Sequence, residues 1–158
     1  MARLSLFTRT ARRFAKFGAA RQALLIEGAL WLLLARVTLI AVPFPRLAPY
    51  LGAFVAPEDE RVIGARSIGT AEQARIAARI GWAVCAAARH VPFTAVCLPQ
   101  AMAARMMLRR RGVPSVLHFG AAKGRCEGLD THAWLDAVGV EVTGFPIAHG
   151  FTEIACFV

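Results

Sequence analysis

The stretch Phe93–Gly112, FTAVCLPQAMAARMMLRRRG, carries both the start and the stop signals of one helix. Pro99 suits a first helical turn, because the N–H that proline lacks would have no partner there. Apolar side chains recur at helical spacing, at Leu98, Met102 and Met106. Gly112 favours the C-terminal cap and Pro114 prevents continuation. The sequence therefore predicts a helix from about Cys97 to Arg111, with a cysteine at its N-terminus.

Beyond Pro114 the spacing of apolar side chains changes to two, which is typical of strands. Short strands are predicted at 115–121, 132–138 and 140–144, and 152–158 is a candidate fourth. A polar, glycine-rich loop is expected at 122–131, and Val138-Gly139 indicates a tight hairpin. Helices followed by an antiparallel sheet give an α+β order.

The segments upstream of this stretch are predicted to be mostly helical. Thr70 opens a capping box, TAEQ, whose helix ends near His90 before Pro92. An apolar helix is expected over 22–41, and an irregular connector with one helical turn over 42–68. We expect a basic helix or tail at 1–21 and one domain at 22–158, with a helical part at 22–112 and a sheet part at 113–158.

The apolar run Ala23–Phe44, ALLIEGALWLLLARVTLIAVPF, raises the question of a membrane. Glu27 and Arg36 interrupt it, whereas a transmembrane helix needs about 20 apolar residues. No small-residue cleavage site of a signal peptide follows. We favour a core helix of a soluble protein, and a helix lying on a membrane surface or a partner, or a true span, are the alternatives.

The composition narrows the class of protein. A formal charge of +9 over 158 residues attracts anions, but no base-reading motif accompanies it, so nucleic acid is a poor candidate. The four cysteines form no C-x-x-C pair, which argues against a disulfide framework or a tetrahedral zinc site. We therefore expect free thiols in a reducing cytoplasm.

A cysteine at a helix N-terminus is a candidate nucleophile. Backbone N–H groups and the helix dipole favour the thiolate there, and the same N–H groups can hold the oxyanion of an acyl-transfer intermediate. A general base must then come from elsewhere in the chain. His132, at the start of a predicted strand, is a candidate partner for Cys97, although the spacing alone leaves a structural role for both residues open.

The other histidines and cysteines have simpler interpretations. His90 and His149 are expected at the surface or at a helix cap, and His118 is expected to be a half-buried structural residue on its strand. Cys126 lies in the polar loop without a fixed oxyanion donor. The remaining two cysteines are spaced like small core residues, Cys85 and Cys156.

The series CLPQAMAARMMLRRRGVPSVLHFGA followed by THAWLDAVGVEVTG resembles the stand-alone transglutaminase-like leader peptidase of lasso-peptide biosynthesis. That family has a Cys-Leu-Pro helix start, an arginine-rich helix end before Gly-x-Pro, and an HAW strand with an acidic residue. The likeness is dense from Cys97 to Gly144 and looser from about Gln22 to Val96. It implies a transglutaminase-like, papain-like fold.

The resemblance implies a cytoplasmic cysteine peptidase that removes the leader from a ribosomally synthesised precursor peptide. Cys97 would be the nucleophile and His132 the general base. The implied partners are the precursor, a separate leader-recognition protein and an ATP-using lasso cyclase. No cofactor or metal is implied. Peripheral contact with the inner membrane is an additional expectation, from the apolar run and the basic N-terminus.

One departure from the family concerns the residue that orients the histidine. The family has an aspartate about a dozen positions after it, where this chain has Thr143-Gly144. Asp136 is too far along the same strand, at about 3.3 Å per residue. A two-residue turn would place Glu141 and Thr143 on the face of His132, with Thr143 diagonally adjacent. Thr143 is then favoured by distance and Glu141 by charge.

Two other classes of function stay open at this point. The same Cys-His machinery can transfer an acyl group to an amine, which would make the chain an acyltransferase. The absent aspartate and the apolar run would also suit a non-catalytic, membrane-associated scaffold.

Overall fold

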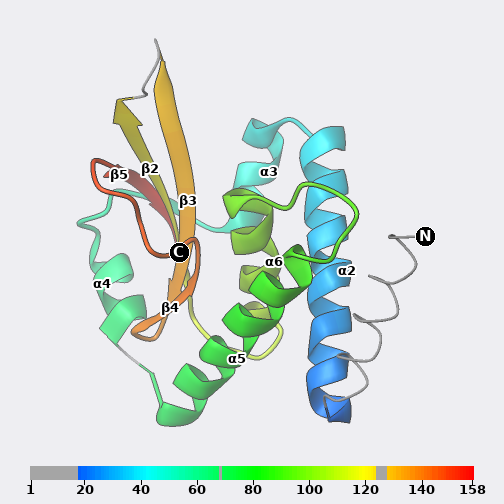
Figure 1. Ribbon diagram of the computed structural model, residues 1–158. Helices are drawn as coiled ribbons and strands as arrows, with labels where there is room; N and C mark the ends of the chain where they lie inside the picture. Colours follow the sequence, from blue (N-terminus) through cyan, green and yellow to red (C-terminus); the bar gives the residue numbers. More distant parts are fainter. Residues whose placement is uncertain (1–17, 68, 124–127) are drawn as a thin grey trace.

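The computed structural model describes residues 18–67, 69–123 and 128–158, and it has an α+β architecture (Figure 1). The helices come first: α2 Ala19–Ala41, α3 Phe44–Leu51, α4 Glu60–Ser67, α5 Ala71–Ala88 and α6 Cys97–Arg109. The strands are β1 Phe54–Val55, β2 Val116–Lys123, β3 Leu129–Ala137, β4 Val140–Thr143 and β5 Thr152–Phe157. The order of helices before an antiparallel sheet confirms the predicted fold class.

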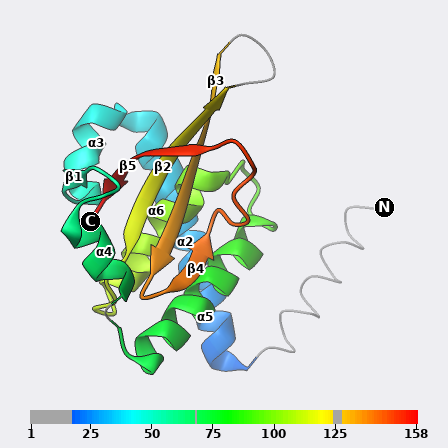
Figure 2. The same ribbon diagram turned by 90° about the vertical axis from the view of Figure 1, so that its left-hand side faces the viewer.

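The five strands form one antiparallel sheet in the order β1-β5-β2-β3-β4. Helices α5 and α6 pack on one face, with α2 behind them, and α4 packs on the other. Because β4 and β5 are not neighbours, the segment 144–151 must cross β3 and β2 to connect them. Figure 2 shows this crossover segment in front of β3, on the face away from α2, α5 and α6.

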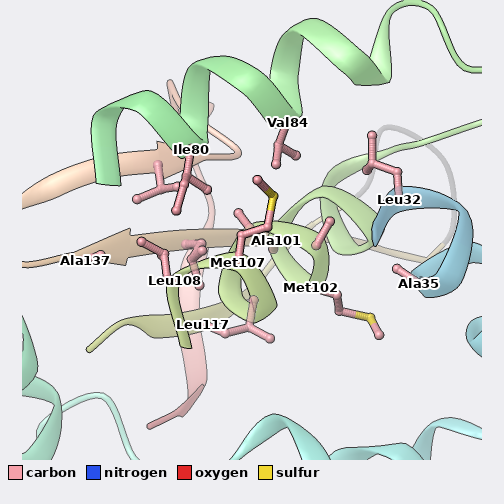
Figure 3. Packing of buried hydrophobic residues seen from close by; sticks show 14 of the residues in the cluster. Leu32, Ala35, Ile80, Val84, Ala101, Met102, Met107, Leu108, Leu117 and Ala137 are labelled. Carbon is pink, nitrogen blue, oxygen red and sulfur yellow. The ribbon is translucent and has the colours of Figure 1, made fainter. Parts of the chain in front are cut away.

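Helix α6 is central to the hydrophobic core (Figure 3). Its alanines at 101, 103 and 104 are fully buried, and small side chains let α2, α5 and the sheet approach closely. The larger side chains around them come from three layers: Leu32, Ile80, Val84, Met107, Leu108 and Leu117. The apolar side chains of α6 are therefore buried on most sides of the helix, against α2, α5 and the sheet.

The predicted helix boundaries are confirmed by cap geometry. Thr70 Oγ1 accepts from the Gln73 N–H at 3.1 Å, and Gln73 Oε1 accepts from the Thr70 N–H at 3.0 Å, so the capping box is complete. Helix α6 begins at Cys97 as expected. Gly112 has a φ of +65°, and the Val113 N–H donates to the Leu108 carbonyl at 3.1 Å, which ends the helix.

The connector 42–68 is more ordered than predicted, and the single helical turn expected there is wrong. It contains α3, α4 and strand β1. Pro43 is the N-cap of α3 and Pro45 lies in its first turn, so the prolines that follow α2 also begin the next helix. The glycine-rich loop is also shorter than predicted, because β2 runs to Lys123 and β3 starts at Leu129.

Helix α2 buries one face and exposes the other. Leu24, Gly28, Leu32 and Ala35 are buried against the rest of the fold. The opposite face carries exposed apolar side chains, called here the α2 stripe: Ile26, Leu30, Leu33, Leu34, Val37 and Ile40. By length and composition α2 could cross a membrane, which is weak support for a span because core helices pass the same criterion. Residues 1–17 of the predicted basic tail lie outside the described residues.

Candidate functional site

Cys97 is the first residue of α6 and is half-buried against the hydrophobic core. Val96 forms the N-cap in an extended conformation, and no described side chain caps this end of the helix. The first-turn N–H groups are therefore not taken up by a capping side chain. This is the arrangement in which a thiolate and a developing oxyanion are both favoured.

The loop that leads into Cys97 is held by Gln100, one turn into α6. Its amide Nε2 donates to the Ala95 carbonyl at 2.6 Å, and its Oε1 lies 3.8 Å from the Cys85 thiol. Burial raises the pKa of Cys85, which keeps that thiol protonated. Cys85 is half-buried, where its spacing predicted a core position.

His132 lies on β3 and packs beneath the crossover segment. Its Nε2 lies 2.7 Å from the Gly144 carbonyl oxygen. Its ring stacks on Trp134, with centroids 5.9 Å apart, and makes a tilted contact with Phe151 at 5.6 Å. A carbonyl only accepts, so this bond requires the proton on Nε2. Nδ1 of the neutral ring is then left as the basic nitrogen.

Cys97 and His132 have different immediate neighbours in the structure. No hydrogen bond joins them within the described ranges. The β3 residues that pack against the helices are Ala133 and Leu135, whereas His132 contacts the crossover segment. The structure thus places the predicted nucleophile at the start of α6 and the predicted base on the opposite face of the sheet, without a direct contact.

The predicted register beyond Asp136 is wrong. A bulge between Leu135 and Asp136 pairs Thr143 with Leu135, where a regular hairpin would pair it with Trp134. Leu135 belongs to the helix-facing core, so Thr143 is not diagonally adjacent to His132 on the predicted face. Its hydroxyl is buried without a hydrogen-bond partner among the described residues.

The other two candidate orienting residues also make no hydrogen bond to His132 within the described part of the chain. Glu141 pairs with Asp136 across the ladder and is exposed. Asp136 instead binds Arg66 at 2.7 Å. Its Oδ2 also lies 3.2 Å from His118 Nε2. Asp136 therefore belongs to a different cluster of polar side chains.

The group that does contact His132 is a main-chain carbonyl that sequence reasoning missed. Gly144 has a φ of +84°, and a Cβ added to it would lie 2.6 Å from the Ala133 carbonyl oxygen. Only glycine fits this conformation and this close approach. The signal was present in the Thr-Gly pair at the position where the family has an aspartate, but a carbonyl carries no sequence signature of its own.

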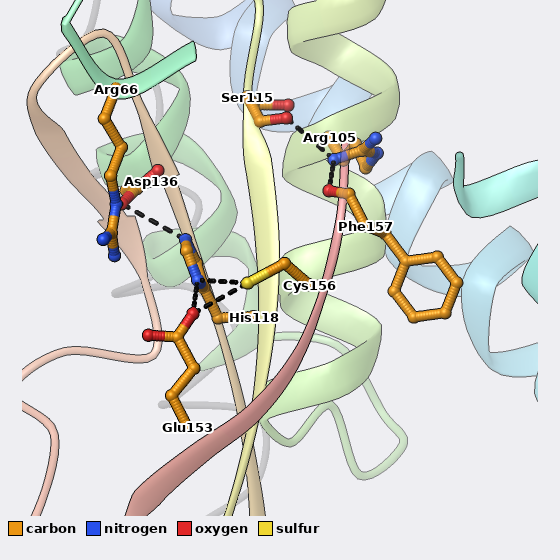
Figure 4. A network of polar contacts seen from close by, with 8 residues as sticks. All are labelled: Arg66, Arg105, Ser115, His118, Asp136, Glu153, Cys156 and Phe157. Atoms are coloured by element: carbon orange, nitrogen blue, oxygen red, sulfur yellow. Dashed lines mark hydrogen bonds and ion pairs between the residues drawn. The ribbon is translucent and has the colours of Figure 1, made fainter. Parts of the chain in front are cut away.

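A second cluster of titratable side chains lies on the sheet itself (Figure 4). The fully buried His118 contacts Glu153 through Nδ1, and its Nδ1 is 3.3 Å from Cys156 Sγ. The Cys156 thiol donates to Glu153 Oε1 at 2.8 Å. Burial, and then Glu153, raise the pKa of Cys156 well above the ordinary range of a thiol.

This second cluster corrects one prediction and confirms another. His118 is completely buried and not half-buried, because β5 and Asp136 enclose it. Cys156 is buried, as its spacing predicted. Sequence reasoning missed the cluster because its members come from separate strands, and pairing across the sheet brings them together.

The remaining histidines and cysteines lie away from these groups or outside the described residues. His90 Nδ1 donates to the Ala86 carbonyl at 2.8 Å at the end of α5, which confirms a capping role. His149 is exposed in the crossover segment. Cys126 lies outside the described residues.

Comparison with known proteins gives a family for the chain. Neither the curated proteins nor the solved structures contain a match to it. The family model of the Transglutaminase-like superfamily matches residues 38–156, which is most of the chain and includes both α6 and the sheet. With helices first and an antiparallel sheet after them, the chain belongs to the transglutaminase-like superfamily.

Proposed function

We propose that this protein is a cysteine peptidase that removes the leader from a ribosomally synthesised lasso-peptide precursor. Membership of the superfamily indicates a cysteine-based peptidase or acyltransferase. The observation that carries the choice of nucleophile is Cys97, half-buried as the first residue of an uncapped central helix. The lasso-peptide substrate rests on the likeness of the CLP, RRRGVP and HAW series to leader peptidases.

In the proposed first step, the Cys97 thiolate attacks the carbonyl carbon of the bond between leader and core peptide. A C–S bond forms, and the carbonyl oxygen takes the negative charge toward the N–H groups at the start of α6. His132 transfers a proton to the leaving amine as the C–N bond breaks. The core peptide leaves with a free N-terminus, and the leader remains as a thioester on Cys97.

In the proposed second step, water attacks the thioester and gives a proton to His132. The C–S bond breaks, the leader leaves as a carboxylic acid, and the thiol is regenerated. An acyltransferase would differ only here, with an amine in place of water. A leader that ends in a free carboxylic acid therefore indicates a peptidase, and a leader joined to an amine indicates an acyltransferase.

The proposed role of His132 is supported by its hydrogen bond to Gly144. With Nε2–H held by the carbonyl, Nδ1 is the nitrogen that exchanges the proton. A backbone carbonyl fixes the tautomer but adds no full negative charge, so it stabilises the imidazolium less than a carboxylate does. Because His132 points to the face of the sheet opposite α6, the proposal requires that β3 rearrange when substrate binds, so that the two side chains meet.

The proposed partners follow from the same likeness. A separate leader-recognition protein would deliver the precursor, and a lasso cyclase would use the amine that cleavage exposes. We place the peptidase in the cytoplasm, with the α2 stripe resting on an anionic membrane surface. The stripe supplies apolar area, and the six basic residues without an acid in residues 1–21 supply charge complementarity: Arg3, Arg9, Arg12, Arg13, Lys16 and Arg21.

Vesicle co-sedimentation tests the membrane contact. The full chain is expected to sediment with vesicles that contain anionic phosphatidylglycerol and to stay in solution with neutral vesicles. Leu30→Glu, at the centre of the α2 stripe, should reduce binding, whereas Glu58→Gln, exposed on another part of the chain, should not. Equal sedimentation of wild type and Leu30→Glu would overturn the membrane contact. Binding of the α2 stripe to the leader-recognition protein, without binding to vesicles, would overturn it as well.

Mass spectrometry of the precursor tests the peptidase function. The precursor is incubated with the leader-recognition protein and either wild type, Cys97→Ala or Cys85→Ala. A leader fragment with a free carboxylate is expected from wild type and from Cys85→Ala, and no fragment from Cys97→Ala. Cys85 is the matched control because it is also half-buried but lies in the last turn of a helix, away from any helix N-terminus.

Three results would contradict this proposal. Equal cleavage by Cys97→Ala would show that Cys97 is not the nucleophile. A leader joined to an added amine, without free acid, would show acyl transfer. Intact precursor with wild type, while the partner demonstrably binds the leader, would favour the scaffold.

A further inference from the structure

Three potential metal-ligating atoms converge on one point between β2 and β5. They are His118 Nδ1, Glu153 Oε1 and Cys156 Sγ, which lie within 4.8 Å of one another (Figure 4). His118 and Cys156 are fully buried, and the Glu153 side chain is 23% exposed. An imidazole, a thiolate and a carboxylate together are a typical donor set for zinc.

The convergence depends on an irregularity in the sheet. Glu153 and Cys156 are three residues apart, so a regular strand would point them to opposite faces. The register between β2 and β5 shifts between Phe119 and Gly120, where Gly120 pairs with Glu153. This bulge turns Glu153 onto the face of Cys156, and bulges are a common means of re-aiming a side chain at a functional position.

The remaining ring nitrogen of His118, Nε2, is buried without a hydrogen-bond partner among the described residues, and a carboxylate lies next to it. Asp136 Oδ2 lies 3.2 Å from Nε2 and is itself held by Arg66 at 2.7 Å. A carboxylate behind a metal-bound histidine usually accepts from the second ring nitrogen, and Asp136 is close enough to Nε2 to do so after a small rotation of the ring. This places the Nδ1 lone pair toward Cys156 and Glu153.

We propose that His118, Glu153 and Cys156 form a binding site for a zinc-class divalent cation, separate from the peptidase residues. Bonds form from the cation to Nδ1, Oε1 and Sγ, and the Nδ1 and thiol protons leave to solvent, with no change of oxidation state. The ion, three ligands, Asp136 and Arg66 then sum to zero charge. The fourth position faces the solvent-exposed side of Glu153 and is available to water.

The distances require only a small movement. In a tetrahedral zinc site, neighbouring ligand atoms are about 3.3–3.6 Å apart, given the usual zinc–ligand bond lengths. Sγ and Nδ1 are already 3.3 Å apart. Only Glu153 must draw back, from 2.8 Å to Sγ, and it is the member that reaches solvent. The bound cation would fasten β5 to β2 near the C-terminal end of the sheet.

Cobalt spectroscopy tests this site without reference to peptidase activity. The untagged full chain is freed of metal with a chelator and titrated with Co²⁺. We expect saturation at one equivalent with a near-ultraviolet thiolate-to-cobalt charge-transfer band, and displacement of the cobalt by Zn²⁺. The band should persist when any of the other cysteines is changed to serine, and it should be absent in Cys156→Ser.

A second variant keeps the test decisive if Cys156→Ser does not fold. The Glu153 side chain is partly exposed, so the Glu153→Gln variant should fold. This variant should keep the thiolate-to-cobalt band and bind zinc about 100-fold more weakly than wild type. Zinc should raise the Tm of wild type but not of Glu153→Gln. Failure of the wild type to bind cobalt, a band that survives in Cys156→Ser, or unchanged zinc affinity in Glu153→Gln would each overturn the proposal.

Discussion

At the scale of single residues, the distinctive feature of this protein is that a main-chain carbonyl contacts His132 where the resembling family has an aspartate. Gly144 can place its carbonyl there because it adopts a positive φ and because it has no Cβ to meet Ala133 and Trp134. The hydrogen bond selects the Nε2–H tautomer. The residue that orients His132 is therefore a glycine, Gly144, which acts through its main-chain carbonyl.

Gly144→Ala should reduce peptidase turnover. The added Cβ would lie 2.6 Å from the Ala133 carbonyl oxygen and 2.8 Å from Trp134 Cα, so the chain must shift and the carbonyl must leave His132. A misplacement of this size is expected to lower kcat by about 100-fold. Nitrogen NMR of the ring would show a loss of the single tautomer. Unchanged kcat together with an unchanged tautomer would contradict the role given to Gly144.

Thr143→Val is the matched change one residue earlier, and it should leave turnover intact. The Thr143 hydroxyl is buried and has no hydrogen-bond partner within the described residues. Replacing it with a methyl group of the same shape should stabilise the fold by about 1 kcal/mol, because an unsatisfied polar group is removed. Urea unfolding and kcat measure the two effects. A large loss of turnover would contradict this prediction and indicate that Thr143 orients His132.

How much of the site could be predicted from sequence differs from residue to residue. The position of Cys97 followed from local signals, since Pro99 and the apolar spacing define where α6 begins. The orientation of β4 could not be predicted, because one extra residue in that strand, Val142, lies opposite the Leu135–Asp136 step and reverses which face Thr143 uses. Bulges leave no reliable mark in composition. The cluster around His118 was missed for the same reason, since it also depends on a bulge.

At the scale of elements, two charged contacts fasten α6 to the rest of the fold. Arg105 is half-buried and donates through one nitrogen to the Ser115 and Phe157 carbonyls, at 2.9 Å each. Burial lowers the pKa of Arg105 to about 10, which leaves it charged at neutral pH. The helix is thereby tied to the start of β2 and the end of β5 (Figure 4).

Arg105→Met should destabilise the protein by about 2–3 kcal/mol, because two carbonyls lose a charged donor. Arg109→Met is the control from the same helix, since Arg109 is exposed and should change stability by less than about 0.5 kcal/mol. Urea unfolding compares the two variants with wild type. Equal stability of Arg105→Met and Arg109→Met would show that the buried contacts contribute nothing.

A second contact links α2 to the end of α6 and should make stability depend on pH. Glu27 accepts from Arg111 at 2.6 Å, and this hydrogen bond is the main cause of the lowered pKa of Glu27. A lowered carboxyl pKa contributes stability that is present above the unfolded value of 4.5 and is lost as the pH falls through the folded value. The contribution is about 1 kcal/mol.

Glu27→Gln should therefore be less stable than wild type at neutral pH, and the difference should disappear in acid. Glu72→Gln removes an exposed helical pair with Arg75 and should change little at either pH. Unfolding curves at neutral pH and at about pH 3 give both comparisons. A difference between wild type and Glu27→Gln that is the same at both pH values would contradict the assigned ion pair.

At the scale of the whole molecule, helical and strand periodicity predicted the α+β order correctly. The four later strands were each located, and both α5 and α6 began at the predicted residues. The segment 42–68 was not predicted well, because prolines begin helices as well as end them, and α3 uses them at its start. The short β1 could not be predicted, since only pairing with β5 makes it a strand.

The central claim is that Cys97 is the reactive thiol of this fold. The most direct test is the rate of iodoacetamide labelling of each cysteine in the folded chain at neutral pH, resolved by peptide mass spectrometry. The account predicts that Cys97 reacts first, that Cys85 is slowed by the raised pKa that burial gives it, and that Cys156 reacts only after unfolding. Labelling of Cys85 as fast as Cys97 would contradict the claim that the start of α6 activates its cysteine.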